Sequence, residues 1–216
     1  GLPGLDDAAW SENISRALDQ GINHLSAYAL TVEPQTALAT LIRKKQLPDT
    51  DPGQQADQFL LLVDQLESAG WEQYEISNFC LPGHRSRHNS AYWEGVPYLG
   101  IGPGAHSYNG HSRRWNISNN ALYVQGINDN LPVWEEEILT PQNRLNEYIM
   151  TSLRRREGLS LLKIESLGGK ETVQQVLAAA NTYLEAGTLQ REVDRLLLTP
   201  EGRLFADGIA AALFRE

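Results

Sequence analysis

The chain has 216 residues, of which 41% are hydrophobic and 21% are charged, proportions ordinary for one large soluble domain or two small ones. Its formal net charge of -9 at pH 7 argues against a broad nucleic-acid surface, because phosphate binding requires clustered Lys and Arg. No apolar run approaches the roughly 20 residues that span a bilayer, and no basic and then apolar start signals export.

Cys80 is the only cysteine of the chain. A single thiol excludes an internal disulfide and also a self-contained iron–sulfur cluster, which usually needs three or four thiolates. It favours a reducing compartment, so we expect a cytoplasmic protein. The chain begins with Gly1-Leu-Pro-Gly4, which is typical of a loop between elements, and we therefore expect a piece of a longer protein.

Residues 6–77 alternate between helical and extended patterns. The expected elements are a helix over 6–20, a strand over 22–30, a short helix near 36–46, a helix from Asp51 that Gly70 ends, and a strand over 71–76. This order is typical of a parallel α/β sheet, in which ligands bind at the carboxyl ends of the strands. The loops 31–34 and 77–93 are those ends.

The pattern changes from residue 140 onward and predicts a small winged-helix-like domain. Its expected elements are a helix opened by Thr140 and Pro141 with Arg154–Arg156 in its last turn, helices at 160–167 and 171–186, a hairpin turning at Val193-Asp194, and a last helix to about 214. Winged helices often bind DNA, but glutamates surround the three arginines. We predict a structural domain and no nucleic-acid partner.

Four of the five histidines lie between positions 84 and 111, among large aromatic residues. His88 is the most notable, with Asn89, Tyr92 and Trp93 close behind it. Imidazole is a frequent axial ligand of haem iron, and Tyr and Trp offer flat apolar faces to a porphyrin. The alternative is a surface histidine beside two packed aromatic residues, which the pattern alone favours.

Other candidate ligand groups in this region each have a structural alternative. His84 and His88 could share a zinc ion only if their segment were helical, and Pro82-Gly83 disfavours that. The segment Gly100–Gly104 lacks the dinucleotide fingerprint; it permits close approach to a ligand or forms tight turns. Arg113 and Arg114 could bind a propionate or phosphate, or could be solvated.

Glu33 and Glu75 lie near the ends of the expected strands, and either could be a site carboxylate. No sequence rule pairs them as acid and base. Cys80 has no basic neighbour before His84, so we expect a buried and inert thiol.

The sequence resembles the HemW-type radical S-adenosylmethionine (SAM) proteins, relatives of oxygen-independent coproporphyrinogen III oxidase (HemN). The motifs that carry the resemblance occur in the same order, namely Gly1-Leu-Pro-Gly, Ser26-Ala-Tyr-Ala-Leu-Thr-Val-Glu-Pro34, Tyr74-Glu-Ile-Ser-Asn-Phe79, Ser86-Arg-His-Asn-Ser-Ala-Tyr-Trp93 and Tyr98-Leu-Gly-Ile-Gly-Pro-Gly-Ala-His-Ser107. His88-Asn89-x-x-Tyr92-Trp93 matches the HNxxYW motif of the HemW branch.

The resemblance implies an α/β fold: the C-terminal part of a partial (βα)6 radical-SAM barrel over 1–116, a connector over 117–139 and the winged-helix-like domain over 140–216. It implies that Ala29 and His106 line a SAM pocket. It also implies that His88, Asn89, Tyr92 and Trp93 form a haem site, with His88 on the iron. The [4Fe–4S] cluster and most SAM contacts would belong to a longer parent protein.

By this resemblance, we expect a haem chaperone that delivers haem to membrane haemoproteins. If it serves these proteins directly, we expect it at the periphery of the membrane. One alternative is an oxygen-independent coproporphyrinogen III oxidase, which decarboxylates propionates by radical chemistry. A second is a non-catalytic fragment that binds a protein partner. Because a partial barrel exposes a strand edge, we also expect self-association.

Overall fold

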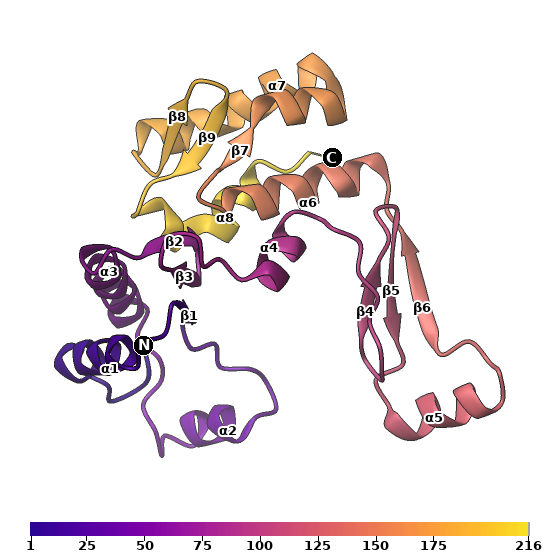
Figure 1. Ribbon diagram of the computed structural model, residues 1–216, viewed down its shortest axis with the longest axis horizontal. Helices are drawn as coiled ribbons and strands as arrows, with labels where there is room; N and C mark the ends of the chain where they lie inside the picture. The colour runs from indigo at the N-terminus through magenta and orange to yellow at the C-terminus, as the bar shows by residue number, and fades with distance from the viewer. Residues whose placement is uncertain (216) are drawn as a thin grey trace. The chain divides into compact units, whose positions relative to one another are not determined.

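The computed structural model describes residues 1–215, coloured along the chain in Figure 1. The chain divides into two compact units, one of residues 1–86 and one from residue 87 onward. Each unit is described by itself. Within the described residues, no helix combines the length and the apolar character that crossing a membrane requires.

The helices of the first unit are α1 (Asp7–Asp19), α2 (Ala37–Arg43) and α3 (Pro52–Ser68). All three confirm predicted helices, and each begins at a side-chain cap. The Asp51 carboxylate, for example, accepts from the backbone N–H of Gly53 at 2.8 Å, with Pro52 at the first helical position. These local signals explain why the predicted starts are accurate.

The sheet of the first unit is antiparallel, so the predicted pairing of parallel neighbours is wrong. Its strands are β1 (His24–Ser26), β2 (Glu72–Glu75) and β3 (Asn78–Cys80), in the order β1-β3-β2. β3 pairs antiparallel with both neighbours, so β1 and β2 run in the same direction and lie on either side of it. The two predicted strands exist, in shorter form, but no local pattern predicted β3 between them.

A tight turn at Ile76-Ser77 causes this reversal. The Glu75 carboxylate accepts from the Ser77 backbone N–H at 3.0 Å and from the Asn78 side-chain amide at 2.5 Å. Glu75 is buried, so it stabilises the turn from inside the protein. The predicted loop at 77–93 therefore begins with a return strand.

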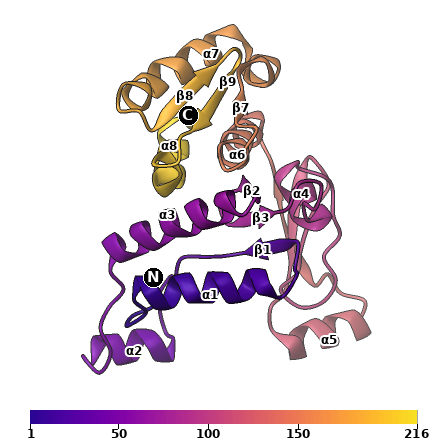
Figure 2. The same cartoon turned by 60° about the vertical axis from the view of Figure 1, so that its left-hand side comes forward.

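One face of this sheet packs on α1 and α3, which run side by side in Figure 2. The buried core consists of Ile14, Leu62, Val63, Leu66, Trp71 and Phe79. Phe79 lies opposite Leu25 and Gln73 in the register and is fully buried. His24, Cys80 and Glu72 share the neighbouring register position, and their side chains therefore lie on the opposite face.

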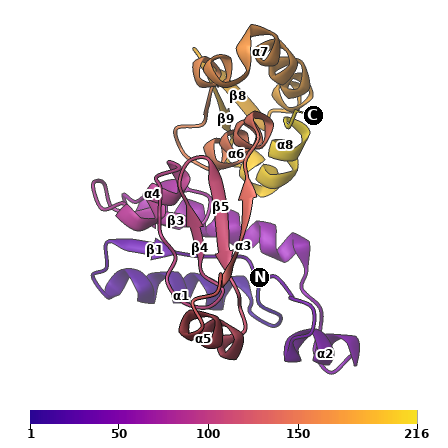
Figure 3. The same cartoon turned by 90° about the vertical axis from the view of Figure 1, so that its right-hand side faces the viewer.

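The second unit begins with α4 (Arg87–Trp93), followed by β4 (His106–Tyr108), β5 (Ser112–Asn116), α5 (Asn120–Asn128) and β6 (Trp134–Ile138). The three strands form an antiparallel sheet in the order β4-β5-β6, with α5 at one end of it (Figure 3). β5 and β6 are complementary in charge, since Arg113 and Arg114 on β5 lie opposite Glu137 and Glu136 on β6. The range 117–139, expected as a connector, thus contains a helix and a strand.

The last part of the unit contains α6 (Pro141–Leu153), β7 (Leu159–Ser160), α7 (Leu161–Glu185), β8 (Leu189–Glu192), β9 (Arg195–Leu198), the short 3-10 helix η1 (Gly202–Phe205) and α8 (Ala206–Ala212). α7 is interrupted at Gly169, whose φ is 84°, so the two helices predicted at 160–167 and 171–186 are confirmed. The hairpin β8–β9 is confirmed too, with its turn at Val193-Asp194.

One boundary in this region differs from the prediction. α6 ends at Leu153, and Arg154 is its C-cap, so Arg154–Arg156 follow the helix instead of forming its last turn. Leu153 is buried together with Ile149 of the same helix, which fixes the end of α6 against the core. The three arginines are therefore displayed by the turn that leads to β7.

Candidate functional site

The HNxxYW motif lies in α4, a helix of 7 residues that ends in a glycine turn. The Val96 N–H donates to the Ala91 carbonyl at 3.0 Å and the Gly95 N–H to the Tyr92 carbonyl at 3.1 Å. Gly95 has a φ of 67°, which glycine adopts without strain. This Schellman pattern fixes the C-terminal end of the helix just after the motif.

The helical period places the four motif residues in two pairs, each four residues apart. His88 and Tyr92 form one pair, with ring centroids 4.8 Å apart and ring planes at 83°. Both side chains are exposed. Asn89 and Trp93 form the other pair on the adjacent stripe of the helix, and both are half-buried. The motif therefore presents the imidazole and the phenol to solvent and turns the indole inward.

Tyr92 begins a row of aromatic rings that continues into the glycine-rich segment. Its ring centroid lies 4.6 Å from that of Tyr98, and the Tyr98 ring lies 6.1 Å from that of Tyr108. Burial raises the pKa of the Tyr98 hydroxyl, with the Arg113 charge acting in the opposite direction. Tyr98 therefore stays neutral and packs as an apolar ring. His88, Tyr92, Tyr98 and Tyr108 thus form a continuous row of rings.

The glycine-rich segment folds back on β4. Tyr98 and Tyr108 exchange two backbone hydrogen bonds of 2.8 and 2.9 Å, and the Gly100 N–H donates to the Ser107 hydroxyl at 3.0 Å. A Cβ at Gly100 would lie only 2.1 Å from the His106 carbonyl oxygen. The close approach that this glycine allows is thus to the chain itself, and of the two alternatives for the segment the structure favours tight turns.

His106 and the two arginines of β5 lie on the same sheet. The exposed His106 ring is 6.3 Å from the Trp115 ring. Arg113 pairs with Glu147 at 2.8 Å and Arg114 with Glu136 at 3.1 Å. The hydrogen bonds from Arg114 and Ser112 lower the pKa of Glu136. Both arginines are thus engaged by carboxylates and are not free for an anionic ligand.

Ala29 belongs to the first unit, where it lines a pocket of about 330 Å³. The walls are mainly apolar, including Leu30, Phe59 and Leu62. Its polar lining residues include two glutamines that the backbone engages: the side-chain amides of Gln55 and Gln58 donate to the carbonyls of Leu30 and Leu5. Such a pocket suits a flat apolar group better than a charged one.

A polar cluster on the sheet of the first unit was missed by sequence reasoning. The His24 Nε2 atom lies 2.8 Å from the Tyr74 hydroxyl, and the Arg85 guanidinium lies 5.4 Å from the centre of the Tyr74 ring. Arg85 also pairs with Glu72 at 2.9 Å. Burial lowers the pKa of His24, so its neutral form is favoured. No signal could have shown this cluster, because its register depends on β3.

Cys80 is fully buried beside this cluster, as predicted, with its thiol 3.6 Å from a Glu72 oxygen. Burial raises the pKa of the thiol above its usual value of 9.0, and the Glu72 charge raises it further. The fold therefore favours the neutral thiol. That contribution to stability is complete below the unfolded-state pKa and is lost as the pH rises through the folded-state pKa.

We expect the free energy of unfolding to fall more steeply above pH 9 in the chain than in its Cys80→Ala variant, because only the chain contains the raised thiol. Urea unfolding between pH 7 and pH 10 measures this difference. The variant is less stable overall because it leaves a cavity, so the comparison concerns the slopes with pH. Parallel slopes would contradict the expectation.

His84 and His88, the disfavoured zinc pair, are not part of a metal-binding cluster in the described part of the chain. Among residues 1–215, no three or more His, Cys, Asp or Glu side chains are arranged to hold a metal ion. His84 lies in the first unit, with its Nδ1 atom 2.8 Å from the Asn23 amide, and His88 lies in the second. A haem iron needs one imidazole from the protein, which the exposed His88 ring offers.

Several known proteins are similar to the chain. Residues 139–205 match the family model described as HemN C-terminal domain. The chain is 37% identical over 99% of its length to heme chaperone HemW of Mycobacterium tuberculosis, covering 53% of that protein. It is 29% identical over its full length to heme chaperone HemW of Bacillus subtilis, covering 57% of it.

A mitochondrial protein from mouse, radical S-adenosyl methionine domain-containing protein 1, is 38% identical over 82% of the chain, which covers 36% of that protein. Among solved structures, the coproporphyrinogen III oxidase HemN of Escherichia coli, a radical SAM enzyme, matches 99% of the chain and 53% of its own. The TM-score is 0.77 at 20% identity, a likeness of fold.

The chain thus has an α/β fold of helices and small sheets like the corresponding part of HemN. It spans about half the length of the HemW proteins that it matches first. Over its whole length the chain is similar to the HemW proteins, and its residues 139–205 match the HemN C-terminal domain family.

Proposed function

We propose that the chain is the haem-binding part of a HemW-type haem chaperone, with His88 as an axial ligand of the iron. The observation that carries this proposal is the exposed His88 imidazole, set edge-on to Tyr92 on the short helix α4. The chaperone name of relatives up to 37% identical supports it. Tyr92 and Tyr98 provide adjoining ring faces against which a porphyrin edge can pack.

The bound haem supplies iron that accepts a nitrogen lone pair, and the residues of the chain do the rest. The His88 ring gives the ligand, and the packing of Tyr92 against it restricts the orientation of the imidazole. Asn89 and Trp93 lie on the adjacent stripe, so in this proposal they support the helix and stay out of contact with the iron.

We assign SAM and the [4Fe–4S] cluster to the part of the relatives that lies outside the chain. The single thiol, Cys80, is buried and cannot hold a cluster. The apolar pocket at Ala29 fits the flat adenine of SAM but not its charged end, since its glutamine amides are already engaged. In this proposal Ala29 lines the apolar side of a SAM site. His106, in the second unit, is proposed as a SAM residue on the resemblance alone.

The finer architecture is proposed on the same basis. Residues 1–116 would be the last part of a partial (βα)6 radical-SAM barrel, 117–139 a connecting segment and 140–216 a winged-helix-like domain. The likeness to HemN in fold and the hairpin β8–β9 beside α7 support this assignment. The function belongs to the longer protein, and the oxidase alternative has support from a similarity of fold alone.

Titration of ferric haem into the chain tests the function. The proposal expects a saturable shift of the Soret band with one haem per chain. For the oxidase alternative, the longer protein with a reconstituted cluster should consume coproporphyrinogen III. Haem binding without that consumption, in a preparation that still cleaves SAM, supports the chaperone; consumption supports the oxidase.

We further propose that the chain receives haem for transfer to membrane haemoproteins and that it self-associates. Large apolar side chains are exposed on each unit, among them Tyr28 and Ile22 in the first. We expect light scattering to give a mass above the 24.1 kDa of one chain. A monomer at high concentration would contradict self-association and would leave the haem proposal intact.

A further inference from the structure

The C-terminal end of α4 is held by two consecutive arginines that follow α6. Arg154 contacts Trp93, and Arg155 contacts Glu94, the next residue. Each arginine also binds a second partner, a carboxylate further along the chain, Asp207 for Arg154 and Glu157 for Arg155. All of these residues belong to the second unit. We call this set of four contacts the arginine clamp.

Arg154 stacks on Trp93 while it pairs with Asp207. Its guanidinium carbon lies 5.3 Å from the centre of the indole ring, and its Nη1 atom lies 2.7 Å from the Asp207 carboxylate. The Arg154 side chain is 21% exposed, whereas that of Asp207 is 80% exposed. An ion pair that exposed contributes little by itself, so the cation–π contact with Trp93 is the stronger part of this arrangement.

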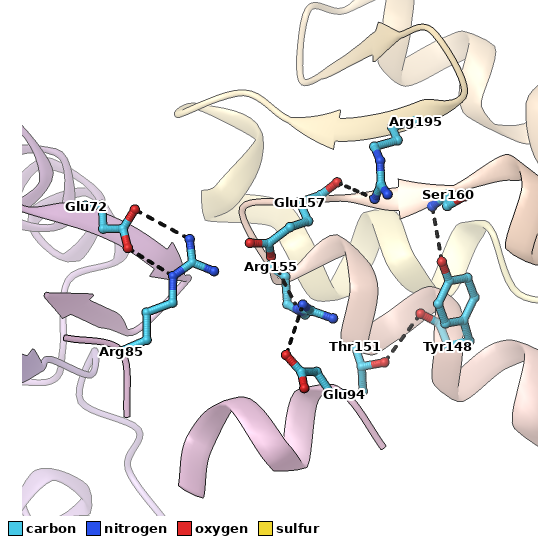
Figure 4. Close-up of polar contacts among 9 residues, drawn as sticks. All are labelled: Glu72, Arg85, Glu94, Tyr148, Thr151, Arg155, Glu157, Ser160 and Arg195. Atoms are coloured by element: carbon cyan, nitrogen blue, oxygen red, sulfur yellow. Dashed lines mark hydrogen bonds and ion pairs between the residues drawn. The ribbon is translucent and has the colours of Figure 1, made fainter. Parts of the chain in front are cut away.

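Arg155 bridges two glutamates, as Figure 4 shows. Its guanidinium lies 3.6 Å from the Glu94 carboxylate and 3.4 Å from that of Glu157. Glu94 follows the last residue of α4, where a negative charge is unfavourable because the carboxyl end of a helix is itself negative. Arg155 offsets that repulsion and ties this end of the helix to the turn after α6.

The turn that presents the arginines is rigid. The Arg155 N–H donates to the Ser152 carbonyl at 3.1 Å, and the Gly158 N–H donates to the Arg155 carbonyl at 3.0 Å. Gly158 has a φ of 67°, and a Cβ there would lie 2.4 Å from the Leu196 carbonyl oxygen on β9. The turn is therefore fixed by close packing against the hairpin, and the arginines start from a defined position.

The clamp matters because α4 has only 7 residues. Isolated helices shorter than about 12 residues are marginal in water, so α4 depends on contacts with its surroundings. His88 and Tyr92 lie on its exposed stripe, where the Tyr92 ring packs on Tyr98 and the His88 ring contacts only Tyr92 among the ring pairs of the described residues. Trp93 and Glu94 are at its C-terminal end, and their partners are the arginines.

We propose that Arg154 and Arg155 are positioning residues that hold α4 from the HemN C-terminal domain and thereby set the direction of the His88 ring. This inference deepens the proposed function and rests on it for the link to haem. It assigns the C-terminal domain the task of orienting the haem-ligand helix. The clamp also gives Arg154 and Arg155 a role that needs no nucleic-acid partner, because carboxylates and an indole ring already bind them.

The test compares Arg154→Met, Arg155→Met and the double variant with the unaltered chain. Arg191→Met, which removes an exposed arginine on β8, is the matched control. Arg154→Lys keeps the positive charge beside Asp207 but replaces the guanidinium over Trp93 by a compact ammonium. Its exchange rates in α4 and its haem affinity should lie between those of the unaltered chain and of Arg154→Met. Thermal melts establish that each variant is folded.

The first readout is amide hydrogen exchange without haem. The amides of Glu94 and Val96 donate to carbonyls within α4. They should exchange about tenfold faster in the double variant, because opening this end of the helix no longer requires the clamp contacts to break. Amides of β8 and β9 should be unchanged. The second readout is haem affinity, expected to fall about fivefold to tenfold on loss of a partly buried cation–aromatic contact.

The outcomes separate the two proposals. Faster exchange in α4 together with weaker haem binding supports the clamp as a positioning device. Unchanged exchange in α4 overturns it, whatever haem does. Faster exchange with unaltered haem affinity also overturns it, provided that His88→Ala does abolish binding. If His88→Ala leaves binding intact, the haem proposal fails instead, and the exchange data alone decide whether the clamp holds α4.

Discussion

Replacing His88 by alanine should lower the affinity of the chain for ferric haem by at least about 100-fold, because even changes outside the immediate ligands of a metal typically cost about 10- to 100-fold. The His88 ring is exposed, so its removal leaves no buried cavity, and the variant should melt at the same temperature as the chain. Haem titration followed by the Soret band measures the affinity.

His111→Ala is the matched control for this experiment. His111 is also exposed in the second unit, with its Nδ1 atom 3.3 Å from an Arg144 nitrogen, but it lies on the β4–β5 turn and not on α4. The His111→Ala variant should bind haem with the same affinity as the unaltered chain. Added imidazole should partly restore the Soret position in the His88 variant. Equal affinities of the two variants would rule out His88 as the ligand.

Gly100→Ala should destabilise the second unit by about 3 kcal/mol, the upper part of the range for overpacking a well-packed site. The new Cβ would meet the His106 carbonyl oxygen at 2.1 Å, so the glycine-rich segment must separate from β4. The hydrogen bond from Gly100 to the Ser107 hydroxyl would weaken as well. Urea unfolding measures the loss of stability.

Gly208→Ala provides the contrast for that variant. Gly208 lies within α8, where an added Cβ meets nothing within 4 Å. The change should stabilise the unit by about 0.5–1 kcal/mol, because alanine favours the helix over glycine. If Gly100→Ala were as well tolerated as Gly208→Ala, the close packing of the glycine-rich segment on β4 would be disproved.

The elements with local signals could be predicted from the sequence. Asp51 with Pro52 gives the start of α3, Thr140 with Pro141 gives that of α6, and the Gly168-Gly169 pair separates the two helices of α7. Caps and breaks of this kind act on residues a few positions away, so a single sequence contains them.

The strands that depend on distant partners could not be predicted. β3 has 3 residues and exists because it lies between β1 and β2, and β6 is a run of glutamates that pairs with the arginines of β5. Neither strand shows the alternation of apolar and polar residues that a half-buried strand would have. The same dependence concealed the contact between His24 and Tyr74.

The candidate site was predictable in part. The sequence identified His88, Asn89, Tyr92 and Trp93 as a group, and the structure has them on one short helix. It could not show that Trp93 turns away from His88 toward Arg154, because that contact joins residues 61 positions apart along the chain, by subtraction of their numbers. The prediction that Arg154–Arg156 lie in the last turn of a helix was wrong, because α6 ends at Leu153 and all three arginines follow it. That boundary decides which residues they reach.

A structure of the haem-loaded chain tests the central claim most directly. The account predicts iron bonded to a ring nitrogen of His88, with the porphyrin beside Tyr92 and with Arg154 still stacked on Trp93. Iron bonded to another histidine, such as His106 or His111, or haem held without a histidine ligand, would contradict it.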